Sequence, residues 1–400
     1  MSDWKEITLG DLVTFQRGHD LSQKQFLGGK YPIVSSYGII GYHNKSTTSG
    51  HGVTIGRSGN SIGKPFFVES EFWAHNTTLY VKEFHDSFPR FVYYLLQTIN
   101  FRALDSGSAV PSLNRNYIHP LPIKVPEYDE QKKIADVLNC LDRKIENLRK
   151  QNDTLEAIAQ TLFKHWFVDF EFPNADGKPY KSSGGAMEPS ELGEIPAGWR
   201  VVRIEEIADR IAMEPFGSRI KTDNFVDSGV PVIRGGNLVN GFNESDFVYI
   251  TEEKADDLKS SNAFPEDIIF THRGTLGQVG FIPTNSQYPR YVVSQNQMLL
   301  SVNKKLVSSR YVYRFFCSKG GLNAILANTN TTGVPSIGRP TTTLKSIQLV
   351  IPEKSILSQF DSLIRVADLK KEANSQQMKT LAETRDFLLP KLMNGKICIA

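Results

Sequence analysis

The chain consists of two similar halves, and this repetition limits its possible folds more than any other feature. The segment RFVY at 90–93 recurs as RYVY at 310–313, and VPS at 110–112 recurs as VPS at 334–336. The matching segments keep the same order in both halves, as expected for a duplicated domain with loop insertions. Two copies of one unit imply pseudo-twofold symmetry. Duplex DNA has the same symmetry in its backbone, so the repeat favours DNA as a partner.

Composition excludes several other classes of protein. A chain of 400 residues is too long for one core, which favours two or more domains. No apolar stretch reaches the ~18 to 20 residues that cross a bilayer, and the first residues lack the pattern of a signal peptide. Cys140, Cys317 and Cys398 match no zinc or disulfide spacing. We therefore expect a cytoplasmic protein with reduced thiols. Because the net charge is only +3, any DNA binding must depend on local positive charge.

Each half begins with a pattern typical of a strand-rich domain. Trp4 and Trp199 open the two copies, and short apolar runs bounded by turn residues follow them. Short aromatic helices are predicted near 89–101 and 309–318. The predicted strands are 52–56, 65–68 and 78–81 in the first copy and 267–270, 279–282 and 298–300 in the second. The pattern indicates an α+β fold with two pseudo-symmetric domains.

After Pro126 and Pro352 the hydrophobic period changes to that of a long helix with a heptad seam. The first seam comprises Ile134, Leu138, Leu141, Ile145, Leu148, Asn152, Leu155, Ala159 and Leu162. The second comprises Phe360, Ile364, Ala367, Lys371, Asn374, Met378, Leu381, Arg385 and Leu388, and stop signals follow at Pro390 and Asn394-Gly395.

Either helix alone could be an amphipathic surface helix. For two long stripes at matching positions we favour an antiparallel coiled coil, because neither stripe would tolerate exposure over such a length. In that pairing Asn152 would lie opposite Lys370 and Lys371, and polar residues near the middle of a rod fix its register. Lys371 and Arg385 also predict looser packing of the second helix.

A segment dense in Gly and Pro separates the two copies, which is typical of a linker. The predicted boundaries are 1–127 for the first domain, 128–170 for the first helix, 171–198 for the linker, 199–353 for the second domain, 354–393 for the second helix and 394–400 for the tail.

No segment carries a convincing active site. GRSGNSIGK at 56–64 differs from a phosphate-binding loop at Ser58, where that loop needs glycine, and at the following Pro65, where it needs a hydroxyl. Asp246 with Glu252 and Glu253 is better interpreted as a solvated charged turn than as a nuclease site. The eight histidines form no metal-ligand spacing. We therefore predict no catalytic residue, no metal site and no cofactor in this chain.

Positive and amide side chains instead gather on the glycine-rich loops. Arginine reads guanine edges, Asn and Gln read adenine, and Lys and small hydroxyls mostly hold phosphates. Each of these residues could equally be an ordinary solvated one. The candidate DNA contacts are Arg17, Lys45, Arg57, Ser58, Asn60, Lys64, Asn114 and Arg115 in the first copy and Arg219, Lys221, Arg234, His272, Arg273, Thr275, Gln278 and Arg339 in the second. The sequence pairs Arg57 with Arg273 as corresponding residues beside glycines.

This layout resembles the specificity subunit of Type I restriction-modification systems over nearly the whole chain. The segments that carry the resemblance are VPSL at 110–113, VPSI at 334–337, EQKKI at 130–134, FKHWFVDF at 163–170, GEIPAGW at 193–199 and LLPKL at 388–392. The resemblance implies that each domain is a target recognition domain for one half of a bipartite DNA sequence. The paired helices would act as spacer and docking site.

The same resemblance implies partners and their cofactors. Two modification subunits would bring S-adenosylmethionine and the adenine methyltransferase site, and restriction subunits would bring the motor, the nuclease, ATP and magnesium. Two alternatives remain at this stage. One is a self-contained DNA methyltransferase or nuclease with an unrecognised site, and the other is a coiled-coil scaffold that binds no DNA.

Overall fold

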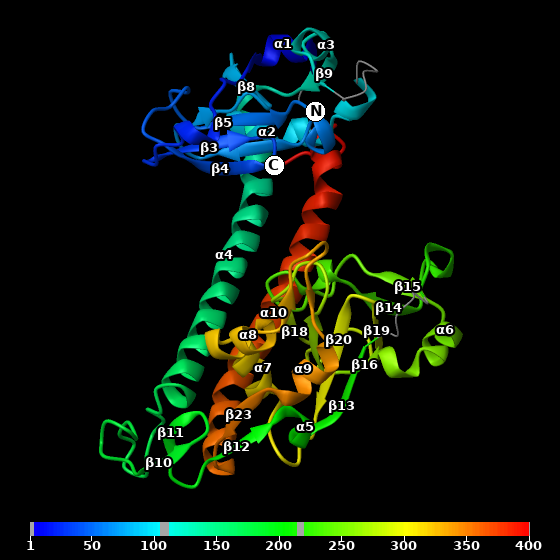
Figure 1. The fold of residues 1–400 in the computed structure, drawn as a ribbon. Helices are drawn as coiled ribbons and strands as arrows, with labels where there is room; N and C mark the ends of the chain where they lie inside the picture. The colour runs from blue at the N-terminus through cyan, green and yellow to red at the C-terminus, as the bar shows by residue number, and fades with distance from the viewer. Residues whose placement is uncertain (1–3, 105–111, 214–219, 400) are drawn as a thin grey trace. The chain divides into compact units, whose positions relative to one another are not determined.

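The computed structural model describes residues 4–104, 112–213 and 220–399, so the predicted residues Val110, Pro111 and Arg219 lie outside the described part. The chain divides into two compact units (Figure 1). The first unit comprises Met1–Arg149 with Ser375–Ala400, and the second comprises Lys150–Asn374. Each unit therefore contains one strand-rich domain and a part of both long helices.

The first unit is built on two small sheets. The larger sheet is antiparallel, with strand order β2-β8-β5-β6 formed by Thr14–Arg17, Thr78–Glu83, Gly52–Gly56 and Pro65–Val68. The smaller sheet has order β4-β3-β7, formed by Gly38–His43, Tyr31–Ser35 and Trp73–Ala74, with β3 and β7 parallel. Helix α2 (Pro89–Thr98) covers the larger sheet and buries Phe91 and Leu95 against Phe15 and Ile55. Its apolar face provides the core of this domain.

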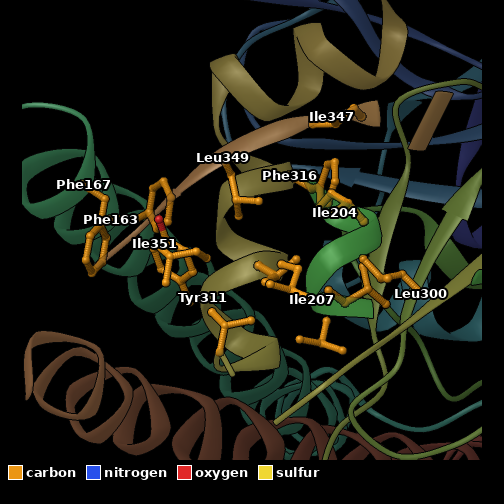
Figure 2. Packing of buried hydrophobic residues seen from close by; sticks show 14 of the residues in the cluster. Phe163, Phe167, Ile204, Ile207, Leu300, Tyr311, Phe316, Ile347, Leu349 and Ile351 are labelled. Carbon is orange, nitrogen blue, oxygen red and sulfur yellow. The ribbon is translucent and has the colours of Figure 1, made fainter. Parts of the chain in front are cut away.

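The second unit repeats this plan. Its larger sheet has order β13-β20-β17-β18, formed by Ala208–Met213, Gln297–Val302, Ile268–Thr271 and Val279–Phe281. The other has order β15-β14-β19-β16, formed by Val248–Ile250, Val230–Ile233, Tyr291–Val293 and Asn262–Ala263, with β14 and β19 parallel. Helix α7 (Ser309–Cys317) takes the place of α2, and Figure 2 shows its Phe316 in the core near Ile204. The same strand order and the same parallel pairing confirm the predicted duplication.

In both units the first strand pairs with the last strand before a long helix. β1 (Lys5–Thr8) is antiparallel to β9 (Pro122–Val125), and β12 (Arg200–Arg203) is antiparallel to β23 (Gln348–Ile351). Each domain thus begins and ends at one strand pair.

The remaining elements are short. The short helices are α1 (Leu9–Leu12), α3 (Arg115–Ile118), α5 (Ile204–Ile207), α6 (Glu252–Asp257), α8 (Lys319–Leu326) and α9 (Pro340–Ser346). The two-residue strands β21 (Thr329–Asn330) and β22 (Ser336–Ile337) pair with each other.

The two long helices are present as predicted. α4 spans Tyr128–Phe167 and α10 spans Lys354–Met393, 40 residues each, or roughly 60 Å at 1.5 Å per residue. The interpretation of Pro390 as a stop signal is wrong, because α10 continues through it to Met393. Pro390 lacks the N–H that would bond the carbonyl four residues earlier, yet the helix continues for three more residues. The chain leaves the helix at Gly395, whose φ is +69°. No helix within the described ranges is long and apolar enough to cross a membrane.

Contacts between α4 and α10 run antiparallel within each unit. In the second unit Phe167 packs edge-on against Phe360, with ring centroids 4.8 Å apart, and Asn152 accepts a hydrogen bond from Asn374 at 2.8 Å. In the first unit Leu138 of α4 shares one buried cluster with Leu389 of α10. The predicted seam residues are all buried or half-buried: Ile134, Leu138, Leu141, Ile145, Leu148, Asn152, Leu155, Ala159, Leu162, Phe360, Ile364, Ala367, Lys371, Asn374, Met378, Leu381, Arg385 and Leu388.

The charged seam residues Lys371 and Arg385, from which looser packing was expected, each meet a carboxylate. Lys371 Nζ lies 2.5 Å from Glu156 within the second unit, and Arg385 Nη1 lies 2.8 Å from Asp142 within the first. Each charge thus meets an opposite charge from the facing helix. Asn152 Nδ2 also donates to the Lys371 carbonyl at 3.4 Å, which confirms the predicted register at that point.

The predicted linker is an ordered part of the second unit. It contains a hairpin, β10 (Met187–Ser190) with β11 (Gly193–Pro196). Phe172 stacks between Tyr180 and Trp199, with ring centroids 4.5 and 4.8 Å away. These aromatic contacts anchor the segment, and its Gly and Pro residues serve tight turns.

Candidate nucleic-acid interface

A glycine-rich loop leaves the larger sheet at the same place in both units. The first loop, residues 57–64, joins β5 to β6, and the second loop, residues 272–278, joins β17 to β18. Gly59 and Gly63 have φ of +69° and +70°, and Gly274 and Gly277 have φ of +94° and +85°. A side chain would be strained at these four positions. The loops therefore keep one backbone form while their other side chains differ.

Main-chain hydrogen bonds clamp the two loops in the same way and reveal their true register. Arg57 N donates to Thr77 O and accepts at its own carbonyl from Leu113 N. His272 N donates to Asn296 O, and its carbonyl accepts from Ile337 N. Arg57 therefore corresponds to His272, and the predicted pairing of Arg57 with Arg273 is wrong by one residue.

The same register extends along both loops. Ser58 bridges to Ser112, and Arg273 bridges to Ser336, so Ser58 and Arg273 are equivalent. At the far end Gly56 N donates to Lys64 O as Thr271 N donates to Gln278 O, both at 3.1 Å. Lys64 and Gln278 are therefore equivalent too. Ser112 and Leu113 thus hold the first loop against its domain, as Ser336 and Ile337 hold the second.

The first loop combines one anchored arginine with exposed polar groups. Arg57 is half-buried, and its Nη1 donates to the Asn76 carbonyl at 3.3 Å. Asn60 and Lys64 are exposed, and Ser58 is half-buried. Arg57 thus has a fixed stem, whereas Lys64 is a solvated point charge of the kind that holds phosphates.

The other predicted contacts of the first unit are all exposed. Lys45 and Arg17 are solvated, and Arg17 lies 3.5 Å from Asp20. Asn114 caps α3, because its Oδ1 accepts from Asn116 N at 3.0 Å, and Arg115 begins that helix. The Asn114 side-chain oxygen is therefore occupied by the cap and is a poor candidate for reading a base.

Sequence reasoning missed Tyr37, which lies beside the first loop. It occupies the turn between β3 and β4 and is 77% exposed, and a Cβ on Gly59 would lie 3.8 Å from its hydroxyl. Ser35 fixes the turn, since its Oγ accepts from Tyr37 N at 3.2 Å and donates to Gly38 O at 3.0 Å. The serine-rich turn between two apolar runs was the signal that could have drawn attention to this residue.

The second loop exposes Arg273 and Thr275 but not His272. His272 is 3% exposed, and burial first, then the neighbouring Arg273, lowers the pKa of its imidazole. A neutral, buried ring cannot contact DNA directly, so the prediction for His272 is corrected to a structural role. Gln278 is half-buried, and its Oε1 accepts from the Thr271 hydroxyl at 2.9 Å.

A shallow recess of about 230 Å³ lies near the second loop. It is lined by Arg234, Gly235, the segment 294–296 and the apolar side chains of Ile220, Phe225 and Val232. Arg234 is exposed, and its Nη2 donates to the Asp246 carbonyl at 3.0 Å. The recess thus combines a held guanidinium and two amide side chains with apolar walls.

The remaining predicted residues of this unit lie apart from the second loop in sequence. Lys221 is exposed and precedes a short turn. Arg339 is exposed, precedes α9 and has φ of +44°, an unusual value for a residue other than glycine. Within the described ranges, no cluster of three His, Cys, Asp or Glu residues could hold a metal ion.

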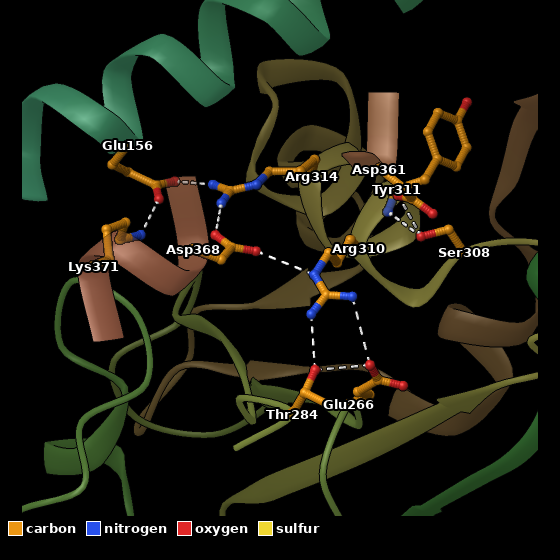
Figure 3. A network of polar contacts seen from close by, with 10 residues as sticks. All are labelled: Glu156, Glu266, Thr284, Ser308, Arg310, Tyr311, Arg314, Asp361, Asp368 and Lys371. Carbon is orange, nitrogen blue, oxygen red and sulfur yellow. Dashed lines mark hydrogen bonds and ion pairs between the residues drawn. The ribbon is translucent and has the colours of Figure 1, made fainter. Parts of the chain in front are cut away.

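Buried polar contacts tie each aromatic helix to the long helices. In the first unit Tyr94 donates to Asp142 of α4 at 2.6 Å. In the second unit Arg314 contacts Asp368 of α10 at 3.0 Å and also Glu156 of α4 (Figure 3). Tyr94 and Arg314 occupy corresponding places in the repeated aromatic helix. In both units a polar side chain at the same position of the aromatic helix therefore ties the strand-rich domain to the long helices.

Among the carboxylates that contact Arg314 in the second unit, Glu156 has the pKa that is shifted furthest. Burial alone would raise its pKa, but Arg314 and Lys371 outweigh burial and hold the pKa at about 2. Arg314 is only 2% exposed, and Arg310 also contacts Asp368, at 3.3 Å. This arrangement keeps Glu156 ionised at neutral pH and compensates the buried guanidinium.

Comparisons with known proteins agree with this architecture. The family model described as "Type I restriction modification DNA specificity domain" matches residues 1–157 and 196–379. The Type I restriction enzyme MjaIX specificity subunit of Methanocaldococcus jannaschii is 27% identical, with 77% of this chain and 68% of that protein covered. The HindI specificity subunit of Haemophilus influenzae is 25% identical, with 99% and 100% covered. The crystal structure of a Type I S subunit from M. genitalium has the same fold, with a TM-score of 0.60, 15% identity and coverage of 98% and 96%.

Proposed function

This chain belongs to the family of Type I restriction modification DNA specificity domains, and we propose that it is the sequence-recognition subunit of a Type I restriction-modification complex. Each strand-rich domain reads one half of a bipartite target on double-stranded DNA. The chain supplies recognition, and the chemistry of methylation and cleavage belongs to its partners.

The equivalence of the two glycine loops is the observation that carries this proposal. The same main-chain clamp holds both loops, yet equivalent positions carry Lys64 in one unit and Gln278 in the other. Ser58 is likewise replaced by Arg273. One scaffold with different side chains suits the reading of two different half-sites, because base contacts specify sequence whereas the backbone sets position.

The long helices suit a spacer. α4 and α10 contact each other within both units, through apolar seams and charge pairs. A stiff pair of helices fixes which stretches of the duplex the two domains reach, so the two half-sites are separated by a gap of fixed length. Half-sites about one helical turn apart, ~34 Å, are natural for twofold-related readers.

The partners follow from this role. Two modification subunits dock on the helices and bring S-adenosylmethionine, and restriction subunits bring ATP and magnesium. The absence of catalytic residues, metal and cofactor from this chain remains part of the proposal. Its exposed Arg and Lys side chains on the loops supply the local charge that DNA binding needs at a net charge of only +3.

Co-expression with the cognate modification subunit tests the proposal. The chromosomal DNA of the expressing strain is sequenced for methylated adenines, and the expected result is one bipartite motif with a fixed gap. Lys64→Ala and Arg273→Ala serve as controls for each other. The first should alter preference only in one half of the motif, and the second only in the other half.

Two outcomes would contradict the proposed function. Methylation or cleavage by the purified chain alone would favour a self-contained enzyme. DNA affinity that does not fall with salt would favour a scaffold, since each phosphate contact should contribute a slope of about −0.9 in log affinity against log salt.

A further inference from the structure

The turn between β3 and β4 presents one tyrosine ring to solvent. Tyr37 is 77% exposed, and a ring with one face packed against the protein could not keep that much of its surface accessible. Its hydroxyl makes no hydrogen bond to the described residues. Tyrosine stabilises a fold by burying its ring or by bonding its hydroxyl, and Tyr37 does neither. Exposure alone is ordinary for a single aromatic residue, so the turn beneath Tyr37 decides what the ring can do.

That turn is held by hydrogen bonds on both sides of Tyr37. Ser35 is only 5% exposed, and its hydroxyl accepts from Tyr37 N and donates to Gly38 O. Ser36 N donates to Thr77 Oγ1 at 3.2 Å. Gly38 has a φ of +102°, which other residues rarely adopt. The stem of Tyr37 is therefore fixed before any ligand binds, so a contact through its ring costs little in ordering.

One residue holds this turn and the first glycine loop together. Thr77 accepts from Ser36 N through its side chain and from Arg57 N through its carbonyl. The Tyr37 hydroxyl reaches the same loop, because a Cβ on Gly59 would lie 3.8 Å from it. The tyrosine and the loop are thus presented as one surface. A duplex bound by the loop lies within reach of the ring.

The second unit has the same framework at this point but a glycine in place of the tyrosine. Val34 O accepts from the first residue after β7 at 2.9 Å, and Ile233 O accepts from the first residue after β19 at 3.0 Å. The parallel strand pairs give the same match of Val34 with Ile233. Three residues further on, the first unit has Tyr37 and the second has Gly236, where a Cβ would meet nothing within 4 Å. The preceding Gly235 lines the recess. The projecting ring therefore belongs to the first unit alone.

We propose that Tyr37 inserts its ring between bases of the first half-site as an aromatic wedge, an inference that rests on the proposed function. A wedge needs a rigid stem, two free ring faces and a neighbouring element that holds the duplex, and Tyr37 has all three. A side chain inserted at a base step partly unstacks it, and pyrimidine–purine steps unstack most easily. The first half-site therefore includes or borders such a step, which is read through its deformability. The second half-site, with Gly236 at the equivalent place, lacks this contact.

The test uses the full complex with the cognate modification subunit, on duplexes built from the mapped motif. 2-Aminopurine, whose fluorescence rises when it is unstacked, replaces one base at a time within and beside each half-site. The parent chain and Tyr37→Phe should both raise the signal at one position of the first half-site, and Tyr37→Ala should not. Tyr37→Ala should also bind about 5- to 100-fold more weakly and lose the preference for the pyrimidine–purine step. A base turned out for methylation gives a signal that does not depend on Tyr37 and is thereby distinguished.

Tyr42→Ala is the matched control. Tyr42 is also an exposed tyrosine of the β3–β4 hairpin, but it lies roughly 13 Å along β4 from the turn, so this variant should behave like the parent chain. Because Tyr37 is exposed, Tyr37→Ala should keep the fold, and thermal melts check this.

The inference is overturned if Tyr37→Ala leaves the fluorescence unchanged, or if Tyr42→Ala loses as much as Tyr37→Ala. Loss of the signal in Tyr37→Phe would also overturn it, since the hydroxyl and not the ring would then be the contact. If the parent chain directs no bipartite methylation at all, the proposed function itself fails, and that result is distinct from these.

Discussion

Replacing Glu156 with glutamine tests whether the buried charge network stabilises the second unit. Glu156 faces Arg314 and Lys371, and its side chain is 25% exposed. Its pKa of about 2 in the folded chain, against an ordinary value of 4.5, is a shift of more than two units. At 1.36 kcal/mol per unit, the ionised carboxylate contributes about 3 kcal/mol at neutral pH. Glu156→Gln should lower the free energy of unfolding by about this amount.

The stabilisation by Glu156 also has a defined dependence on pH. The folded-state pKa is depressed, so the contribution is fully present above about pH 4.5 and is lost as the pH falls towards 2. The difference between the parent chain and Glu156→Gln should therefore shrink between these values. Asp169→Asn is the matched control, because Asp169 pairs with Lys164 of α4 on the exposed surface of the same unit and should cost at most about 1 kcal/mol.

Urea unfolding followed by tryptophan fluorescence is the assay. All variants carry Trp4→Phe and Trp73→Phe, so that only Trp166 and Trp199 remain. Both lie in the core of the second unit and report its unfolding. The reasoning is refuted if Glu156→Gln costs less than about 1 kcal/mol at pH 7, or if its cost is the same at pH 7 and pH 3.

Three further predictions follow from the helices and the loops. Asn152→Leu should lower stability by about 1 to 3 kcal/mol in urea, because it removes the closer of the two hydrogen-bond partners of the buried Asn374 amide. Asn152→Leu combined with Asn374→Leu should recover the loss, and an equal loss in both would contradict this. Gly63→Ala should reduce stability and the recognition of one half-site more than Gly274→Ala does. A Cβ on Gly63 would lie 2.4 Å from Phe101 Cβ, whereas a Cβ on Gly274 would meet nothing within 4 Å. Motif mapping and thermal melts measure the two effects. One heptad inserted into both α4 and α10 should lengthen the gap of the methylated motif, and an unchanged gap would disprove the spacer role.

The fold could be predicted largely because its signals are local and repeated. The strands around 52–56 and 298–300 are short apolar runs between turn residues, and both helices keep a heptad spacing, although Lys371, Asn374 and Arg385 interrupt the apolar seam of the second. The Asn152 register was predictable because one polar residue stands out in an apolar seam. Pro390 misled because the helix runs only three residues beyond it, and sequence alone does not show whether a helix ends at a proline or within the next turn.

The candidate interface was less predictable, because the sequence records residue types and not the direction of side chains. Arg57 and Arg273 look equivalent beside their glycines, yet the clamp by Leu113 and Ile337 shifts the match to His272. That histidine is buried by contacts that are distant in sequence. The serine-rich turn that holds Tyr37 marks a turn but not an interface, since the position of Tyr37 beside Gly59 depends on how the β3–β4 turn folds.

The pairing of first and last strands has a consequence for how such proteins change. β12 pairs with β23 so that Arg200 lies opposite Ile351 and Arg203 lies opposite Gln348. The entry and exit of the second domain therefore lie at neighbouring points. A foreign domain with the same closing pair could be grafted there without altering either helix. Genetic exchange at these junctions would replace one half of the recognised sequence at a single step, while the other half and the gap are inherited unchanged.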